Sequence, residues 1–245
     1  GEAIAAGKLQ NLAHDLALMQ AMGVRVVLVH GFRPQVNEQL KTKGYEAKYS
    51  HGLRITDEPA LDSAQEAAGQ IRFEIEAAFS QGLPNTPMAG STVRVMSGNF
   101  LTARPVGIVD GIDFQHSGVV RKVDTEGIVR TLDQGAMVLL SPFGFSPTGE
   151  AFNLAMEEVA TSVAIALQAD KLIFLTEIAG IRSRPTEPAS EDNPVDTELP
   201  LAEAEKLLAT LPPATLPTDT GFYLKHGVTA CKGGVDRSHI LPFAV

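Results

Sequence analysis

Two short apolar runs dominate the pattern of this sequence, and each is followed by a glycine-bearing loop and a helical pattern. Residues 24–29 read Val-Arg-Val-Val-Leu-Val, and residues 136–140 read Ala-Met-Val-Leu-Leu. Nearly continuous aliphatic runs of this length are typical of strands buried on both faces of a parallel sheet. A third strand pattern follows the next helical segment, at residues 171–175. This alternation predicts an α/β fold with a mainly parallel, open sheet and helices on both faces.

The rest of the chain divides into helical, hairpin and loop patterns. Apolar residues recur at helical spacing from Leu9 to Met19, and Pro34 suits the first turn of a second helix. Further helices are expected at residues 58–81, 124–133, 154–169, 200–211 and 222–232, hairpins within 93–123, and a last strand at 237–243. Loops are expected at 141–153, 182–197 and 212–219, and the polar, Pro-rich segment 182–197 is expected to be exposed and mobile. No composition shift marks a boundary, so we expect a single domain over residues 1–245.

Composition excludes several classes of partner. The chain carries 20 Lys and Arg against 29 Asp and Glu, a net charge of −9, and has no basic block. Nucleic acids and anionic membranes are therefore not expected partners. The apolar run at 136–140 is far shorter than the roughly 20 residues of a membrane helix. The single cysteine, Cys231, is typical of a protein of the reducing cytoplasm. The six histidines do not have metal-ligand spacing.

The first glycine loop, His-Gly-Phe-Arg-Pro at residues 30–34, is a candidate ligand site. Ligands of open α/β sheets bind beyond the carboxyl ends of the strands. Gly31 permits a tight turn there, and Arg33 offers a bidentate partner for a carboxylate or phosphate. A plain strand–helix connection with a solvated arginine explains the same residues equally well.

The second glycine loop, residues 144–149, has the two-glycine spacing of a P-loop. Glu150 and Ala151 follow it, where a P-loop requires Lys and Ser or Thr. A carboxylate in place of the ammonium would repel a phosphate, so we reject the P-loop. A ligand-facing turn of another kind remains open.

Asn153, Glu157 and Arg54 each have two interpretations. Asn153 and the acidic residues after it fit a helix cap and a favourable helix dipole, and a catalytic role is the alternative. Arg54 is either a carboxylate anchor or part of a surface salt bridge. His226, next to Lys225, fits a polar helix face.

Several segments together resemble the amino-acid kinase family, and acetylglutamate kinases in particular. Residues 27–36 resemble the strand and ligand loop of those kinases, with Arg33 where the kinases usually carry glycine. Residues 52–57 resemble the segment whose arginine, here Arg54, holds the substrate carboxylate. Residues 97–104, 111–114, 138–169, 176–181 and 231–240 are also similar, so the resemblance covers nearly the whole chain. It implies an amino-acid-kinase, carbamate-kinase-like fold and ligand binding by Gly31, Arg33, Arg54 and Asn153.

Two departures from the kinase pattern concern phosphoryl transfer. Where active kinases resemble Asn-x-Asn-Ala-Asp, residues 153–157 read Asn-Leu-Ala-Met-Glu, so Glu157 stands at the aspartate position and is expected to be vestigial. The lysine that contacts ATP phosphates in those kinases falls near Tyr223. Since phosphoryl transfer relies on cations around the transferred group, the resemblance implies a catalytically silent domain.

The loop Gly-x-Arg-Pro-Gln and the altered helix start resemble instead the kinase-like domain of bacterial N-acetylglutamate synthases. In that family the domain precedes an acetyltransferase domain, and arginine binds it as an inhibitor. The resemblance implies a homo-oligomeric arginine sensor with no cofactor of its own, while acetyl-CoA and L-glutamate are used by the acetyltransferase domain. By that comparison, the family's first strand and the acetyltransferase domain lie outside residues 1–245.

The same resemblance places Tyr223, Lys225, His226 and Gly227 beside the arginine site, and a solvated helix face is the alternative for Lys225 and His226. Two other functions stay open. An active acetylglutamate kinase would hold its substrate with Gly31, Arg54 and Asn153 and use Glu157 in place of the aspartate. A ligand-free structural module is the third hypothesis.

Overall fold

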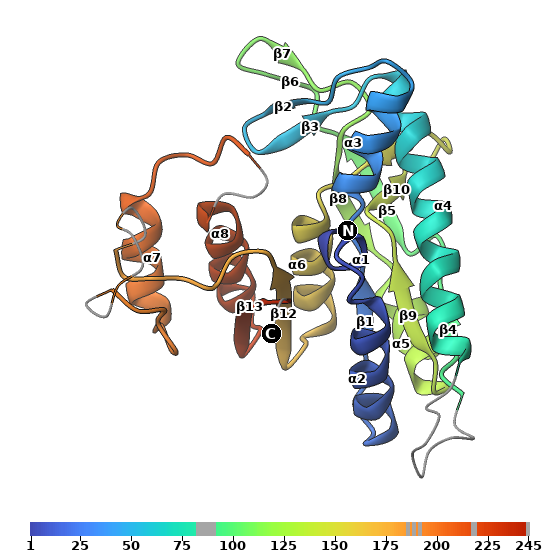
Figure 1. Ribbon diagram of the computed structural model, residues 1–245, viewed down its shortest axis with the longest axis vertical. Helices are drawn as coiled ribbons and strands as arrows, with labels where there is room; N and C mark the ends of the chain where they lie inside the picture. Colours follow the sequence, from blue (N-terminus) through green and yellow to red (C-terminus); the bar gives the residue numbers. More distant parts are fainter. Residues whose placement is uncertain (82–91, 185–186, 188–189, 191–192, 217–219, 244–245) are drawn as a thin grey trace. The chain divides into compact units, whose positions relative to one another are not determined.

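The chain folds into two compact units. The computed structural model describes residues 1–81, 92–184, 187, 190, 193–216 and 220–243. One unit comprises Gly1–Ala47 and Ile55–Met156, and the other comprises Lys48–Arg54 and Glu157–Val245. Figure 1 labels most helices and strands of both. Nothing in the composition along the chain indicates this division.

The first unit combines a parallel sheet, a mixed sheet and several helices. Its helices are α1 (Glu2–Ala5), α2 (Leu9–Ala21), α3 (Arg33–Thr42), α4 (Glu58–Ser80) and α5 (Thr125–Asp133). Strands β1 (Val27–Val29), β9 (Met137–Leu140) and β4 (Val95–Met96) form a parallel sheet in that order. Strands β11 (Ala151–Asn153), β10 (Phe143–Phe145), β5 (Leu101–Pro105) and β8 (Gly118–Val123) form the mixed sheet, and β6 (Ile108–Val109) and β7 (Ile112–Asp113) form a hairpin.

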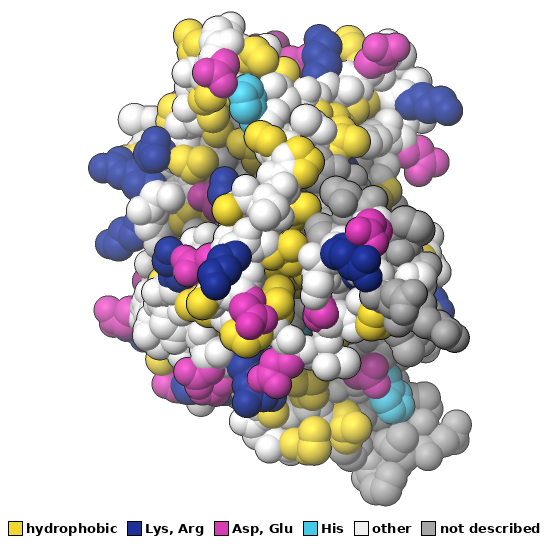
Figure 2. Space-filling model, turned by 90° about the vertical axis from the view of Figure 1, so that its left-hand side faces the viewer, with side chains coloured by type: hydrophobic (Ala, Val, Ile, Leu, Met, Phe, Trp, Pro, Cys, Tyr) yellow, Lys and Arg dark blue, Asp and Glu magenta, His cyan; other side chains and the backbone are white. Residues whose placement is uncertain are grey.

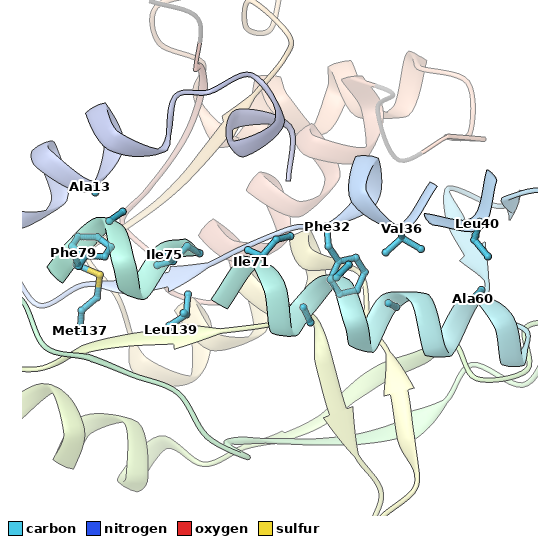
Figure 3. Packing of buried hydrophobic residues seen from close by; sticks show 14 of the residues in the cluster. Ala13, Phe32, Val36, Leu40, Ala60, Ile71, Ile75, Phe79, Met137 and Leu139 are labelled. Atoms are coloured by element: carbon cyan, nitrogen blue, oxygen red, sulfur yellow. The ribbon is translucent and has the colours of Figure 1, made fainter. Parts of the chain in front are cut away.

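Helix α4 organises the core of this unit. Asp57 caps its first turn by accepting a hydrogen bond from the Ala60 amide at 3.1 Å. Small and branched apolar residues then recur along the buried face of α4, which packs against α2 and α3. Figure 3 shows Ile71, Ile75 and Phe79 of α4 beside Met137 and Leu139 of β9.

The two predicted buried strands differ in burial. All four residues of β9 are buried, as its aliphatic run predicts. Strand β1 begins only at Val27 and its residues are half-buried, and Val24 is 42% exposed. The prediction that residues 24–29 form a strand buried on both faces is therefore wrong. β9 lies between β1 and β4, so only β9 is the central strand of this sheet.

Residues 141–153, expected to be a loop, contain a hairpin. Strands β10 and β11 pair antiparallel, with Phe143 opposite Asn153. The turn is closed locally, because the Ser146 amide donates to the Glu150 carbonyl at 2.9 Å and Gly149 adopts a φ of 85°. The candidate ligand turn at 144–149 is thus mostly the tip of this hairpin.

The second unit is built around a parallel strand pair. Strands β12 (Lys171–Thr176) and β13 (Arg237–Pro242) pair in parallel. Buried side chains of β12 pack with residues of α6 (Met156–Leu167) and α8 (Thr220–Lys232), and α7 (Leu201–Thr210) packs on α8. The hairpin partners β2 (Lys48–Ser50) and β3 (Leu53–Ile55) form a separate small sheet.

The predicted loop at 182–197 is described only in part. Its described residues form neither helix nor regular strand, and most are exposed. Asn193 is an exception, because it is buried and its side-chain amide donates to the Arg184 carbonyl at 2.9 Å. Mobility of this segment stays a prediction, and residues 185–186, 188–189, 191–192 and 217–219 of the predicted loops lie outside the described residues.

Charges of both signs are mixed on the surface. On the face drawn in Figure 2, Lys and Arg side chains are interspersed with Asp and Glu side chains and do not gather in one area. In the described part of the chain, no helix is both long and apolar enough to cross a membrane. The same residues contain no group of three or more His, Cys, Asp or Glu side chains arranged to hold a metal ion.

Candidate functional site

The carboxyl ends of β1 and β9 lie side by side because Val29 pairs with Leu140 in the parallel sheet. His30 follows β1 directly, and its backbone amide donates to the Leu140 carbonyl at 3.1 Å. Its ring Nε2 lies 2.7 Å from the Ser141 hydroxyl, and its Nδ1 lies 3.1 Å from the Gly31 carbonyl. Since a carbonyl only accepts, Nδ1 donates to Gly31 and Nε2 accepts from Ser141. These two hydrogen bonds hold the ring of His30, the first residue of the glycine loop, in one orientation.

Burial keeps the His30 imidazole neutral. The side chain is almost completely buried. Loss of hydration lowers the pKa of His30 to about 4, against a smaller upward effect of the bond to the Gly31 carbonyl. In the sequence, His30 is recognisable only as part of a glycine loop. Its position directly after a strand and before Gly31 was the signal available in the sequence.

Gly31 is tightly packed within the first unit. A Cβ atom at this position would lie 3.4 Å from the Gly1 nitrogen and 3.7 Å from the Met156 methyl group. The glycine loop therefore contacts the start of α6, three residues after Asn153. Arg33 pairs with Glu2 at 3.2 Å, and its side chain is 17% exposed, so the alternative of a solvated arginine is wrong.

Asn153 belongs to a buried polar cluster instead of a helix cap. It is the last residue of β11, and α6 begins only at Met156, so the capping prediction is wrong. Its Nδ2 donates to the Thr56 hydroxyl at 3.0 Å, and that hydroxyl lies 2.7 Å from the Ser117 hydroxyl. All three side chains are buried. Asn153 was predicted as a candidate site residue, but neither Thr56 nor Ser117 was.

A backbone hydrogen bond links the His30–Ser141 pair to the cluster that contains Asn153. The Leu154 amide donates to the Pro142 carbonyl at 2.8 Å, so the turn after Asn153 is bonded to the segment after β9. Gly31, His30, Ser141 and Asn153 thereby belong to one edge of the first unit. This edge presents neutral amide, hydroxyl and imidazole groups, which suit ligand binding better than proton transfer or phosphoryl transfer.

Arg54 and Glu157 belong to the second unit, and both are buried. Arg54 is 8% exposed, and its guanidinium lies 4.9 Å from the centre of the Tyr49 ring. Burial excludes the surface salt bridge proposed as one alternative for Arg54. Glu157 is 3% exposed in the first turn of α6, and its carbonyl accepts a 2.7 Å hydrogen bond from Thr161.

Helix α8 holds the four residues predicted near an arginine site, and their environments differ. Tyr223 is 2% exposed, lies against the Phe174 ring, and donates to the Glu177 carboxylate at 3.4 Å. Gly227 is buried, and its carbonyl accepts a hydrogen bond from Ser238. Lys225 is exposed. Of the four, Tyr223 and Gly227 are therefore packing residues of the second unit.

His226 is not part of a solvated face, in contrast to its neighbour Lys225. Its ring contacts the Phe222 ring at 4.7 Å, and its Nδ1 lies 3.4 Å from the Thr161 hydroxyl. Burial is the main reason that the pKa of His226 falls to about 4, and the charge of Lys225 adds to it. The solvated-face alternative holds for Lys225 and is wrong for His226.

The chain is similar to known proteins along nearly its whole length. The model of the amino acid kinase family matches residues 1–240. An amino-acid acetyltransferase of Ralstonia nicotianae is 53% identical over 245 residues, covering 100% of this chain and 52% of the relative. An amino-acid acetyltransferase of Vibrio atlanticus is 46% identical over 246 residues, covering 100% of this chain and 55% of the relative. The chain thus spans about half the length of the curated relatives it matches.

Solved structures agree with this result. N-acetylglutamate synthase from Neisseria gonorrhoeae, complexed with coenzyme A and L-arginine, aligns with a TM-score of 0.86 at 38% identity, covering 98% of this chain and 53% of that chain. Carbamate kinase from Giardia lamblia, bound to AMP-PNP, aligns with a TM-score of 0.69 at 16% identity, covering 97% of this chain and 84% of that chain. At that lower identity the likeness shows the fold alone, and it confirms the predicted carbamate-kinase-like fold.

Proposed function

We propose, from the premise that this chain belongs to the amino acid kinase family, that it is the kinase-like regulatory domain of an N-acetylglutamate synthase. It binds L-arginine and assembles into homo-oligomers. Through that binding it lowers the activity of an acetyltransferase domain, which converts acetyl-CoA and L-glutamate to N-acetyl-L-glutamate. The protein works in the cytoplasm. The domain itself carries no cofactor and performs no phosphoryl transfer.

One observation carries the proposal. The Neisseria gonorrhoeae synthase, complexed with coenzyme A and L-arginine, matches 98% of this chain at 38% identity with a TM-score of 0.86. Two curated relatives at 53% and 46% identity carry the name amino-acid acetyltransferase. Because each relative is about twice as long as the matched region, acetyl transfer is assigned to the other half of the protein and regulation to this one.

The environment of Tyr223 supports a silent kinase-like domain. By the resemblance, a lysine that contacts ATP phosphates belongs near this position. Tyr223 instead packs in the apolar cluster of the second unit and donates to Glu177. An aromatic side chain cannot supply the positive charge that stabilises a transferring phosphoryl group. Glu157, at the position of the kinase aspartate, is buried.

An active acetylglutamate kinase is the second candidate. Asn153, retained from the kinase pattern, lies on the same edge as Gly31, and this observation favours some ligand there. Under that candidate Asn153 and Gly31 hold acetylglutamate. A coupled ADP-release assay with N-acetyl-L-glutamate and ATP·Mg²⁺ discriminates the two, since an active kinase turns over at about 1 s⁻¹ or faster.

Calorimetry tests the proposed ligand directly. L-Arginine, N-acetyl-L-glutamate and ATP·Mg²⁺ are titrated in turn into the natural protein that contains this domain. We expect arginine to bind and ATP·Mg²⁺ not to bind. Arginine needs acceptors for its guanidinium and ammonium groups and a donor for its carboxylate. On α8 only Lys225 and His226 remain as candidates, so the double variant Lys225→Ala, His226→Ala is expected to weaken arginine binding. ATP·Mg²⁺ binding without arginine binding would overturn the proposal.

A further inference from the structure

The first unit contains a buried cluster of polar side chains that packing alone does not explain. Thr56, Ser117 and Asn153 are 0%, 4% and 7% exposed, and they come from three segments far apart in the sequence. Buried hydroxyl and amide groups cost free energy unless they are hydrogen-bonded, and apolar groups of the same shape would pack as well. A hydrogen-bonded polar cluster at the end of a strand therefore points to a role in orienting a functional group.

The backbone brings these three residues together. The His116 amide donates to the Thr56 carbonyl at 2.9 Å, and the Asn153 amide donates to the His116 carbonyl at 2.9 Å. The segment around His116 is thus bonded between Thr56 and Asn153 like a middle strand. Its entry is fixed as well, because Gln115 adopts a φ of 50° and its amide donates to the Asp113 carboxylate at 2.9 Å. The positions of the three side chains follow from this backbone.

The hydrogen bonds within the cluster fix the plane of the Asn153 amide. Its Nδ2 donates to the Thr56 oxygen at 3.0 Å, and the Ser117 oxygen lies 2.7 Å from the same Thr56 oxygen. A threonine hydroxyl has two lone pairs and one proton, so it can serve both partners at once. One of the two Asn153 N–H bonds is held in this way. The other N–H bond and the carbonyl oxygen of the rigid, planar amide then have fixed directions as well.

We propose that Thr56 and Ser117 are positioning residues that hold the Asn153 side-chain amide in one orientation at the edge shared with the Gly31 loop. The oriented amide offers one donor and one acceptor to an amino-acid derivative. Only the identity of that ligand rests on the section above, where the second candidate function places acetylglutamate at Asn153 and Gly31. The orientation of the amide is a property of the first unit alone.

The test uses the exchange of the Asn153 side-chain amide protons with water, measured by NMR. Loss of the signals in Asn153→Asp assigns them. Wild-type exchange is expected to be at least about tenfold slower than for Asn11, which is exposed. Thr56→Val, which keeps the shape but removes the hydroxyl, is expected to abolish this protection, and Thr56→Ser is expected to retain it. Protection that survives in Thr56→Val would overturn the inference.

Two further variants control for general effects on folding. Thr131→Val removes another buried threonine hydroxyl of the first unit, one that donates to the Gly127 carbonyl at 2.8 Å, and it should leave the Asn153 signals unchanged. Ser117→Ala leaves the Asn153–Thr56 bond in place and is expected to raise the exchange rate several-fold. If Thr56→Val fails to fold, Ser117→Ala decides the question, and an unchanged exchange rate would contradict the inference.

A ligand titration separates this inference from the proposed function. N-Acetyl-L-glutamate and L-arginine are titrated into wild type, Thr56→Val and Thr56→Ser. Thr56→Val should raise the Kd of any probe bound at this edge by about tenfold, whereas the Kd of Thr56→Ser should stay within about twofold of the wild-type value. Equal affinities for N-acetyl-L-glutamate in all three proteins would show that Thr56 does not position Asn153 for this ligand. If wild type binds neither probe, the ligand assignment fails, while the exchange rates still decide the orientation of Asn153.

Discussion

At the scale of single residues, His30 couples the stability of the first unit to pH. Burial lowers its folded-state pKa to about 4 from an ordinary value of 6.5. The neutral form is bonded to Gly31 and Ser141. Below pH 6.5 the imidazole of His30 is protonated in the unfolded chain, while in the folded chain it stays neutral down to about pH 4. The stability from this group is therefore complete above pH 6.5 and is lost as the pH falls through about 4.

Replacing His30 with a residue that does not titrate should flatten this dependence. Between about pH 7 and about pH 5, His30 alone should cost the wild type about 2 kcal/mol of its free energy of unfolding. His30→Gln removes the titrating group and keeps an amide near Ser141. Between the same two pH values, the free energy of unfolding of this variant should therefore fall by about 2 kcal/mol less than that of the wild type. Urea denaturation at both pH values measures it, with His51→Gln at an exposed position as control. Equal pH dependence in wild type and His30→Gln would refute a buried neutral His30.

Tyr223 is expected to behave as a core residue. Its ring lies in the apolar cluster of the second unit, while its hydroxyl makes a long bond of 3.4 Å to an exposed carboxylate. Tyr223→Phe should therefore change the free energy of unfolding by less than about 1 kcal/mol, and Tyr223→Ala should lower it by about 3–5 kcal/mol. Denaturant titration checks both. A large loss of stability in Tyr223→Phe would mean that the hydroxyl, not the ring, holds this position.

The residues missed in the sequence share one property. The His30–Ser141 and Thr56–Ser117 bonds join segments about 60 to 110 positions apart in the sequence. Local spacing carries no such information. Gly31 and Asn153 were identified because glycine after a strand and asparagine before a helix are local signals. Of the interpretations of Asn153, the helix cap is wrong because β11 was not foreseen.

At the scale of elements, long periodic helices were predictable and short paired strands were not. Helix α4 follows its predicted range to within one residue, because a cap at Asp57 and a long periodic pattern define it. Strands β10 and β11 have three residues each, among glycines and prolines that favour a loop. Their pairing depends on β5, which pairs in parallel with β10. Tertiary contacts thus decided this region.

The segment 182–197 is expected to be the first site of proteolysis. Arg184 is exposed, and its ion pair with Glu187 leaves both side chains about half exposed, 51% and 50%. Helix α6, in contrast, has no exposed residue, because each of its residues is buried or half-buried. Limited digestion with a broad-specificity protease and mass spectrometry of the fragments should show cleavage within 182–197 before any within Met156–Leu167. Early cuts inside α6 with 182–197 intact would contradict this.

At the scale of the whole molecule, the net charge leads to a prediction about nucleic acids. The net charge is −9, and charges of both signs are mixed on the face drawn in Figure 2. Phosphate backbones are bound through clustered Lys and Arg side chains. We expect no salt-sensitive binding of a DNA or RNA oligomer at about micromolar concentration, as measured by fluorescence anisotropy. A signal that falls with rising salt would show that a cationic surface had been overlooked.

The order of strands, loops and helices was sufficient to predict the α/β class, and the departures at Glu157 and Tyr223 were sufficient to question phosphoryl transfer. The division into two compact units was not predictable, because the residues 48–54 join the second unit from within the first half of the chain. Such a division depends on contacts between distant segments and leaves no mark on local composition.

The central claim is that this domain senses arginine on behalf of an acetyltransferase. The most direct measurement is release of free coenzyme A from acetyl-CoA, with L-glutamate as acceptor, by the natural protein that contains this domain, over a series of L-arginine concentrations. We expect glutamate-dependent release of coenzyme A that falls as the arginine concentration rises. In the variant Lys225→Ala, His226→Ala, the inhibition curve should shift to higher arginine concentrations. Absence of acetyl transfer, together with ATP-dependent phosphorylation of N-acetyl-L-glutamate by the same protein, would contradict the central claim.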